Sequence, residues 1–270
     1  MRVVDSLTRL RAADTFFLDM DGTLYVDEVL LPGTQDLLAA IARRGGRRLF
    51  LTNNSSARGE DYRQRLERLG IPAQRMEILT SGDATIHYIL GKTPYRSAYV
   101  VGTPALLADF ASAGIDIERA DPECLVVGFD RTLTYAKLER ATRMLFAGKP
   151  YYATHPDKTC ITHDGLIPDV AAIIAALAAV TGRQPDVIVG KPYPEIVANA
   201  LQRLGGSPER AVMIGDQLDT DMTLARTSGI LGALVLSGET SPARLAAWPV
   251  EHRPPLVASS VAEIADWLRA

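Results

Sequence analysis

Short apolar runs alternate with amphipathic segments along the whole chain, and this alternation restricts the fold more than any other feature of the sequence. The apolar runs have the length of strands and cover residues 16–18, 47–52, 97–102, 124–129, 186–190, 210–216 and 231–238. The segments between them, such as 61–70, 135–146 and 193–205, repeat apolar residues with helical spacing. A parallel sheet with helices on both faces produces this rhythm, so we predict an α/β fold.

The composition indicates a globular protein and disfavours several classes. With 270 residues and 47% hydrophobic content, the chain suits one large domain or two modest ones. A net charge of −3 and scattered arginines argue against nucleic-acid binding. The longest apolar run, 170–180, is too short to span a bilayer and is predicted to be a buried helix, and we expect no membrane association. Two cysteines, Cys124 and Cys160, suit a reducing compartment, so we predict a cytoplasmic location.

Polar residues stand at the ends of four of the apolar runs. Ligand groups of open parallel sheets gather at the carboxyl ends of the strands, so these residues are expected to meet at one site. They are Asp19 and Asp21, Thr52 and Asn53, Lys191, and Asp216.

The chemistry of these side chains suits a phosphate and a magnesium ion. Mg²⁺ prefers oxygen ligands and takes one or two carboxylates, which Asp19 and Asp216 supply. Lys191 would balance phosphoryl charge, and Thr52 with the N–H groups of residues 53–56, at the start of the next expected helix, would hold the oxygens. A carboxylate can also attack phosphorus. Asp19 and Asp21 are two positions apart, so extended backbone would place both on one side, one as nucleophile and the other as proton donor.

Each motif has another interpretation when it is taken alone. DMDG resembles the start of a calcium loop, but Leu24 and Leu30 stand where that loop needs glycine and glutamate. A bare D-x-D-G is also a common turn, LTNNSS a helix N-cap cluster, GKP a solvated loop lysine, and GDQLDTD an acidic helix start. Their order and their shared position at the ends of apolar runs favour a single site.

Together the motifs DMDGT, LTNNSS, GKP and GDQLDTD, in this order, resemble the haloacid dehalogenase-like phosphatase superfamily. The resemblance implies that Asp19 is the nucleophile and a metal ligand, and that Asp21 is the acid/base with its backbone carbonyl on the metal. It further implies that Thr52, Asn53 and Lys191 bind the phosphate and that Asp216 is the second carboxylate ligand of the metal. Asp221 would be an outer carboxylate.

The motif spacing indicates an inserted domain. Asp19 and Thr52 are 33 positions apart, whereas Asn53 and Lys191 are 138 apart. Nearly the whole chain resembles the NagD-like and p-nitrophenylphosphatase-like branch, which carries a large α/β cap between the second and third motifs. We therefore expect a Rossmann-like core over 1–82 and 188–270 and an inserted cap over 83–187.

Two positions depart from that branch and bear on substrate choice. The chain has Thr154-His155 where the group carries Thr-Asn, and Asp169-Val170 where the group has a glycine-rich helix start. The cap closes over the leaving group, and by their place in its loops Asp130, Arg131, His155 and Asp157 are candidates for substrate contact. Arg131 would pair with a second anionic group, although a surface ion pair is the alternative. For His155 the alternative is a hydrogen-bonded loop residue.

The sequence therefore predicts a Mg²⁺-dependent phosphomonoester hydrolase that forms an aspartyl-phosphate. The expected substrate is a small phosphorylated metabolite: a sugar phosphate, a phosphoglycolate-like acid, pyridoxal phosphate or a nucleotide monophosphate. The alternatives are a phosphomutase or phosphotransferase on the same core, and a non-catalytic phosphate- or metal-binding protein. A homodimer is left open.

Overall fold

The computed structural model describes residues 3–162 and 164–270, which form two compact units. The first unit comprises the chain up to Thr52, Arg63–Ile78 and Lys191–Ala270, and the second comprises Asn53–Tyr62 and Leu79–Gly190. The boundaries expected from the sequence are a core of 1–82 and 188–270 and a cap of 83–187. These boundaries stay a prediction.

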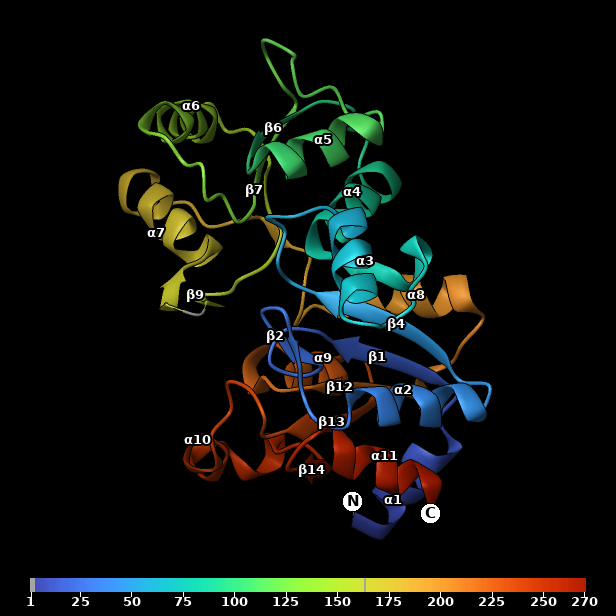
Figure 1. Cartoon of the computed structure of the whole chain (residues 1–270). Coiled ribbons are helices and arrows are strands. Elements are labelled where there is room, and N and C mark those ends of the chain that lie inside the picture. The colour runs from blue at the N-terminus through green and yellow to red at the C-terminus, as the bar shows by residue number, and fades with distance from the viewer. Residues whose placement is uncertain (1–2, 163) are drawn as a thin grey trace. The chain divides into compact units, whose positions relative to one another are not determined.

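A six-stranded parallel sheet is the centre of the first unit, with strand order β14-β13-β12-β1-β4-β5 (Figure 1). Its strands are β1 (Thr15–Asp19), β4 (Arg47–Thr52), β5 (Ile78–Thr80), β12 (Ala211–Gly215), β13 (Leu231–Val235) and β14 (Leu256–Ala258). Every residue of β1 is buried, because β1 lies between β12 and β4 and both of its faces are covered. A small antiparallel hairpin, β2 (Tyr25–Val26) with β3 (Val29–Leu30), follows β1.

Amphipathic helices cover this sheet. Helices α1, α2 and α11 pack together, with α1 against β13 and β14 and α2 against β4, whereas α9 packs against β12 and β13. The helices here are α1 (Val3–Ala12), α2 (Thr34–Arg43), α8 (Glu195–Leu204), α9 (Thr223–Thr227), α10 (Pro242–Ala247) and α11 (Val261–Arg269), while α3 (Gly59–Arg68) has residues in both units. Shorter helical turns cover Arg75–Glu77, Pro208–Arg210, the π-helical Leu218–Met222 and Val250–His252.

The second unit has its own parallel sheet with helices on both faces. Its strand order is β11-β8-β7-β6, and Leu125 and Val127 of β7 face the core under α6 and α7. Cys124 and Val126 alternate with them and face the core under α4 and α5. The strands of this sheet are β6 (Ala98–Val101), β7 (Cys124–Val127), β8 (Tyr151–Ala153) and β11 (Val187–Ile188). A separate antiparallel pair consists of β9 (Thr159–Thr162) and β10 (Gly165–Pro168). The helices are α4 (Ser81–Lys92), α5 (Pro104–Ser112), α6 (Tyr135–Phe146) and α7 (Val170–Thr181). The predicted α/β architecture is confirmed.

The prediction that 170–180 forms a buried helix is right about the helix and wrong about one of its faces. Ile173, Ile174 and Leu177 of α7 are buried, whereas Val180 is 62% exposed. Most of the remaining positions are alanines, whose small apolar surface is inexpensive to leave in water. Within the described ranges, no helix combines the length and apolar character needed to span a membrane.

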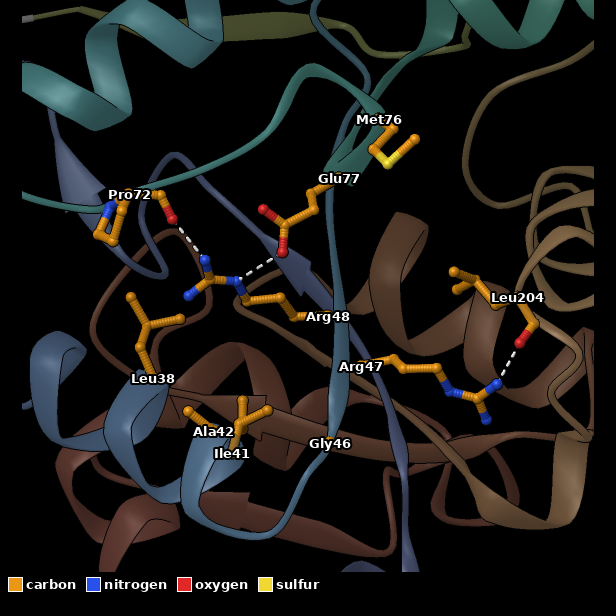
Figure 2. Close-up of a pocket in the computed structure, with 10 residues that line it drawn as sticks. All are labelled: Leu38, Ile41, Ala42, Gly46, Arg47, Arg48, Pro72, Met76, Glu77 and Leu204. Carbon is orange, nitrogen blue, oxygen red and sulfur yellow. Dashed lines mark hydrogen bonds and ion pairs between the residues drawn. The ribbon is translucent and has the colours of Figure 1, made fainter.

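A cavity of about 610 Å³ lies at the amino end of β4 (Figure 2). Arg47 and Arg48 line it, and both guanidinium groups bind protein atoms. Arg48 donates to Glu77 (3.0 Å) and to the Pro72 carbonyl, and Arg47 donates to the Leu204 carbonyl. None of the sequence-predicted site residues lines this cavity.

Gly33, directly before α2, is predicted to be intolerant of a side chain. Its φ is +88°, and an added Cβ would lie 2.3 Å from Cβ of Ala262 on α11. Gly45 also has a positive φ, +65°, but an added Cβ there meets no atom within 4 Å. We expect Gly33→Ala to lower the free energy of unfolding by roughly 3 kcal/mol or more, because backbone strain and overpacking add. Gly45→Ala should lower it by about 1 kcal/mol, from strain alone. Denaturant titration of both variants is the measurement, and equal losses would contradict the packing argument.

Candidate active site

Three neighbouring strands of the first unit end at polar, buried side chains. Asp19 is the last residue of β1, Thr52 is the last residue of β4, and Asp216 directly follows β12. Because β12, β1 and β4 are adjacent and parallel, their carboxyl ends lie at the same edge of the sheet. The exposed fractions of the three residues are 7%, 4% and 1%.

Lys191 joins these carboxylates from a segment outside the first sheet. The apolar run before it forms β11, which pairs with β8 in the sheet of the second unit. Lys191 instead begins the segment with which the chain returns to the first unit. Its ammonium donates to Asp221 Oδ1 (2.7 Å) and to Asp19 Oδ1, and its side chain is 4% exposed.

Asp216 is held from two sides. The Thr23 hydroxyl lies 3.2 Å from Asp216 Oδ1 and 3.1 Å from Asp19 Oδ2, so its single hydrogen can bond to either carboxylate. The backbone N–H of Glu239, in the loop after β13, donates to Asp216 Oδ2 at 2.6 Å. Both groups neutralise part of the carboxylate charge without adding a positive ion.

The buried cluster carries more negative than positive charge. Burial, with the charges of Asp19 and Asp221, raises the pKa of Asp216 well above its ordinary value. Burial also raises the pKa of Asp221 to about 7, against the opposing effect of Lys191. Burial lowers the pKa of Lys191, but Asp19 and Asp221 outweigh it and the pKa is raised overall.

This charge excess fits a divalent cation. One oxygen from each of Asp19, Asp216 and Asp221 lies within 4.8 Å of the other two. All the candidate ligand atoms are carboxylate oxygens. Mg²⁺ prefers oxygen ligands of this kind, whereas softer metal ions prefer nitrogen or sulfur ligands. Asp221 accepts from Lys191 on one oxygen and from the Gln217 N–H (3.1 Å) on the other.

Asp21 stands apart from this cluster in exposure and pairing. Its side chain is 35% exposed, and Arg65 Nη1 lies 3.9 Å from its Oδ1. Although part of the side chain reaches water, the surrounding protein desolvates the carboxylate, and this effect, followed by the charge of Asp19, raises the pKa of Asp21 to about 6. Gly22, with φ +82°, makes the turn that follows. A carboxyl group that titrates near neutral pH can both give and take a proton.

The two predicted phosphate-binding residues belong to different units. Thr52 ends the first segment of the first unit, and Asn53 begins the second unit. The Asn53 side-chain amide donates to Asp157 Oδ1 at 2.9 Å. The expectation that a helix starts at 53–56 is wrong, because α3 begins at Gly59 and the Asn54 side chain instead accepts from the Ser56 N–H at 2.9 Å. Such Asx turns compete with helix formation.

In the cap loop 128–134, Asp130 and Arg131 have different surroundings. The Asp130 side chain is fully buried, pairs with Lys137 Nζ at 2.6 Å and accepts from the Thr132 N–H at 2.8 Å. Asp130 is thus held by its own loop and by the first turn of α6. Arg131 is exposed. Contact of either residue with a substrate stays a prediction.

His155 lies at the centre of a buried hydrogen-bond network in the second unit. Its Nε2 is 3.0 Å from Asp169 Oδ1, and its Nδ1 is 2.8 Å from the Thr154 hydroxyl and 3.3 Å from the Ser81 hydroxyl. Ser81 in turn donates to the Asn53 carbonyl. His155 thus helps to fix the backbone at Asn53, while its own contact with a substrate, like that of Asp157, stays a prediction.

Three residues close to the carboxylates were not among the site residues predicted from the sequence. Thr23 lies inside the quoted motif DMDGT, but its hydroxyl was given no role. Gly238 and Glu239 lie in the loop after β13, and Glu239 directly follows the run 231–238. These two residues contribute through the backbone, which no residue-type pattern reveals.

The pH dependence of stability tests the charge excess. A folded-state pKa above the ordinary value means that the folded protein binds more protons than the unfolded chain, so stability falls as pH rises. For Asp221 this window runs from about 4 to about 7. Between pH 5 and pH 8, chelator-treated protein should therefore lose stability, and Asp221→Asn should lose less. Denaturant titration of both proteins is the measurement, and identical pH dependence would contradict the charge assignment.

The comparisons with known proteins agree with this geometry. Two family models match the chain, one described as haloacid dehalogenase-like hydrolase over residues 16–116 and one described as HAD-hydrolase-like over residues 188–264. The ribonucleotide monophosphatase NagD of Escherichia coli is 34% identical over 91% of this chain and 96% of its own length.

Solved structures extend the likeness to the whole fold. The crystal structure of a 4-nitrophenylphosphatase from Thermotoga maritima superposes with a TM-score of 0.92 at 39% identity, covering 96% of this chain and 98% of that one. A glycerol phosphate phosphatase from Mycobacterium tuberculosis, in complex with magnesium, has a TM-score of 0.87 at 28% identity, over 95% of this chain and 77% of that one. The chain belongs to the haloacid dehalogenase-like hydrolases, in the branch of the NagD-like and p-nitrophenylphosphatase-like proteins.

Proposed function

We propose that this protein is a Mg²⁺-dependent phosphatase that removes the phosphoryl group from a small phosphorylated metabolite by way of an aspartyl-phosphate. The observation that carries the proposal is the pairing of Lys191 with Asp19 and Asp221 beside Asp216, all of them buried. The named activities of the relatives, phosphatases of ribonucleotides, 4-nitrophenyl phosphate and glycerol phosphate, support the same reaction class.

In the first step, an Asp19 carboxylate oxygen would form a bond to phosphorus while the bond from phosphorus to the leaving oxygen breaks. The Lys191 contact holds Asp19 in one orientation. Asp21 would donate its proton to the leaving oxygen, so that a neutral alcohol departs. Its pKa of about 6 leaves a protonated fraction at neutral pH.

In the second step, water would attack the phosphorus of the aspartyl-phosphate. Asp21, now a carboxylate, would accept a proton from that water, and the bond between Asp19 and phosphorus would break. Inorganic phosphate leaves, and both side chains return to their starting forms. This use of one carboxyl group as acid and then as base suits a pKa near the working pH.

The remaining residues would bind and neutralise. Thr52 and Asn53 would hold phosphate oxygens, with Lys191 facing their charge. Asp19 and Asp216, with the backbone carbonyl of Asp21, would hold Mg²⁺, and Asp221 would orient its water and Lys191 from outside. When bound, Mg²⁺ would withdraw charge from the phosphoryl oxygens.

The second unit would act as the cap that selects the leaving group. Four residues of this unit are candidates for contact with the substrate. Asp130, His155 and Asp157 contact other residues of the unit, whereas Arg131 is exposed on the loop 128–134. We therefore place Arg131 first as a contact for a second anionic group on the substrate. A homodimer and a cytoplasmic location stay predictions.

The nucleophile is tested by Asp19→Asn. An amide cannot form the aspartyl-phosphate, so release of phosphate from p-nitrophenyl phosphate with Mg²⁺ should fall by about a thousandfold or more. The matched control is Asp36→Asn, on the exposed face of α2, where the side chain is 64% exposed. The wild-type activity should also disappear on chelation and return with added Mg²⁺. Turnover by Asp19→Asn at the wild-type rate would end the covalent mechanism.

The acid is tested by the dependence of Asp21→Asn on the leaving group. p-Nitrophenolate leaves without protonation, whereas an alkoxide does not, so the loss of kcat should be much smaller for p-nitrophenyl phosphate than for glycerol phosphate. General acid catalysis is typically worth about 10²–10⁴-fold, and a difference in this range is expected. Equal losses on both substrates would assign Asp21 another role.

A further inference from the structure

The loop that follows β13, residues 236–240, lies directly against the candidate metal ligand Asp216. The Glu239 N–H donates to Asp216 Oδ2 at 2.6 Å, and the Ser237 hydroxyl donates to the Gly22 carbonyl at 3.1 Å. The loop thus contacts both the ligand and the turn after the nucleophile Asp19. No sequence motif of the site includes these residues.

Two glycines leave space for the Asp216 carboxylate and for nothing larger. A Cβ added to Gly238 would lie 2.0 Å from Asp216 Oδ2, and one added to Gly22 would lie 2.6 Å from the same oxygen. Because Oδ2 is enclosed by these two backbones and accepts from Glu239, the carboxylate cannot rotate freely. Its other oxygen, Oδ1, is therefore the one directed at Thr23, 3.2 Å away.

The outer side of the loop is joined to the loop after β12 by one arginine. Arg244, on α10, pairs with Glu239 Oε1 at 2.7 Å through Nη1, and with Asp219 Oδ2 through Nη2. Asp219 belongs to the π-helical turn Leu218–Met222, which also carries Asp221. One guanidinium therefore holds the two loops that position Asp216 and Asp221.

The exposure of these pairs argues against a role in stability alone. The side chains of Arg244, Glu239 and Asp219 are 33%, 40% and 56% exposed. Ion pairs of this exposure contribute little to folding stability, because water screens the two charges. Their effect on the orientation of a metal ligand is a separate quantity, because residues that orient metal ligands typically change metal affinity by about 10–100-fold.

We propose that Gly238, Glu239 and Arg244 form a positioning group that holds Asp216 for the divalent cation and so sets the affinity of this protein for Mg²⁺. The inference rests on the proposed function, since it takes Asp216 to be a metal ligand. Neither the Glu239 side chain nor the Arg244 side chain is assigned a contact with the substrate or with the ion, and Gly238 has no side chain. Their action passes through the Glu239 N–H and the space beside Gly238.

Titration calorimetry of the full, metal-free chain with MgCl₂ tests the proposal. Gly238→Ala should weaken Mg²⁺ binding by about 10–100-fold, because the Cβ displaces the Asp216 carboxylate. Arg244→Ala, a change at a partly exposed side chain, should weaken binding by about tenfold while the thermal midpoint of the metal-free protein stays unchanged. The Mg²⁺ affinity of Arg244→Lys should lie between that of Arg244→Ala and that of the wild type. An ammonium keeps the positive charge but lacks the forked guanidinium that spans two carboxylates.

The matched control is Arg226→Ala, an exposed arginine on α9, which should bind Mg²⁺ as wild type does. In assays of phosphate release, the Mg²⁺ concentration for half-maximal rate should shift in parallel, whereas kcat at saturating Mg²⁺ should stay within about twofold for Arg244→Ala. Wild-type Mg²⁺ affinity in both Gly238→Ala and Arg244→Ala would overturn this inference and leave the proposed function intact. A wild-type chain that binds no Mg²⁺ would overturn both.

Discussion

The buried ion pairs of Lys191 with Asp19 and Asp221 are the interaction on which the rest of the site depends. They place one ammonium among three carboxylates, with Asp216 as the third, at exposures of a few per cent. One positive charge cannot compensate three negative charges where water is excluded, and the raised pKa values of Asp216 and Asp221 express this imbalance. The imbalance costs stability in the metal-free protein. The same imbalance attracts a divalent cation, so affinity for the ion and strain in its absence have one physical cause.

The order of strands in the first unit explains how such a cluster can form. β13, β12, β1 and β4 are consecutive neighbours in a parallel sheet, so the residues after each strand lie along a single edge. The loops from two of these strands are further joined outside the site by Arg244. The second unit has a separate sheet with a packed core on each face. Neither of these two cores includes a residue of the acidic cluster.

Prediction from the sequence worked where one local rule was sufficient. Asp19, Thr52 and Asp216 were found because a polar residue after a buried parallel strand must lie at the carboxyl edge. The rule also brought Lys191 to this site, but an apolar run does not reveal which of two sheets it joins, and β11 belongs to the second. It also overlooked Glu239, whose backbone N–H carries the contact and whose side chain faces Arg244. The start of α3 was misjudged because the Asn54 side chain satisfies the Ser56 N–H in place of a helix.

The sequence by itself determined the α/β class, the alternation of strands and helices, and the chemical identity of the carboxylates and the lysine. These follow from side-chain periodicity and from residue type, which are local properties. Only the tertiary structure decided which carboxylates share Lys191, that Thr23 stands between Asp19 and Asp216, and that Gly22 and Gly238 enclose one carboxylate oxygen. Those facts depend on distances between residues up to about two hundred positions apart. Such distances are fixed by strand order and packing, and no short stretch of the chain encodes them.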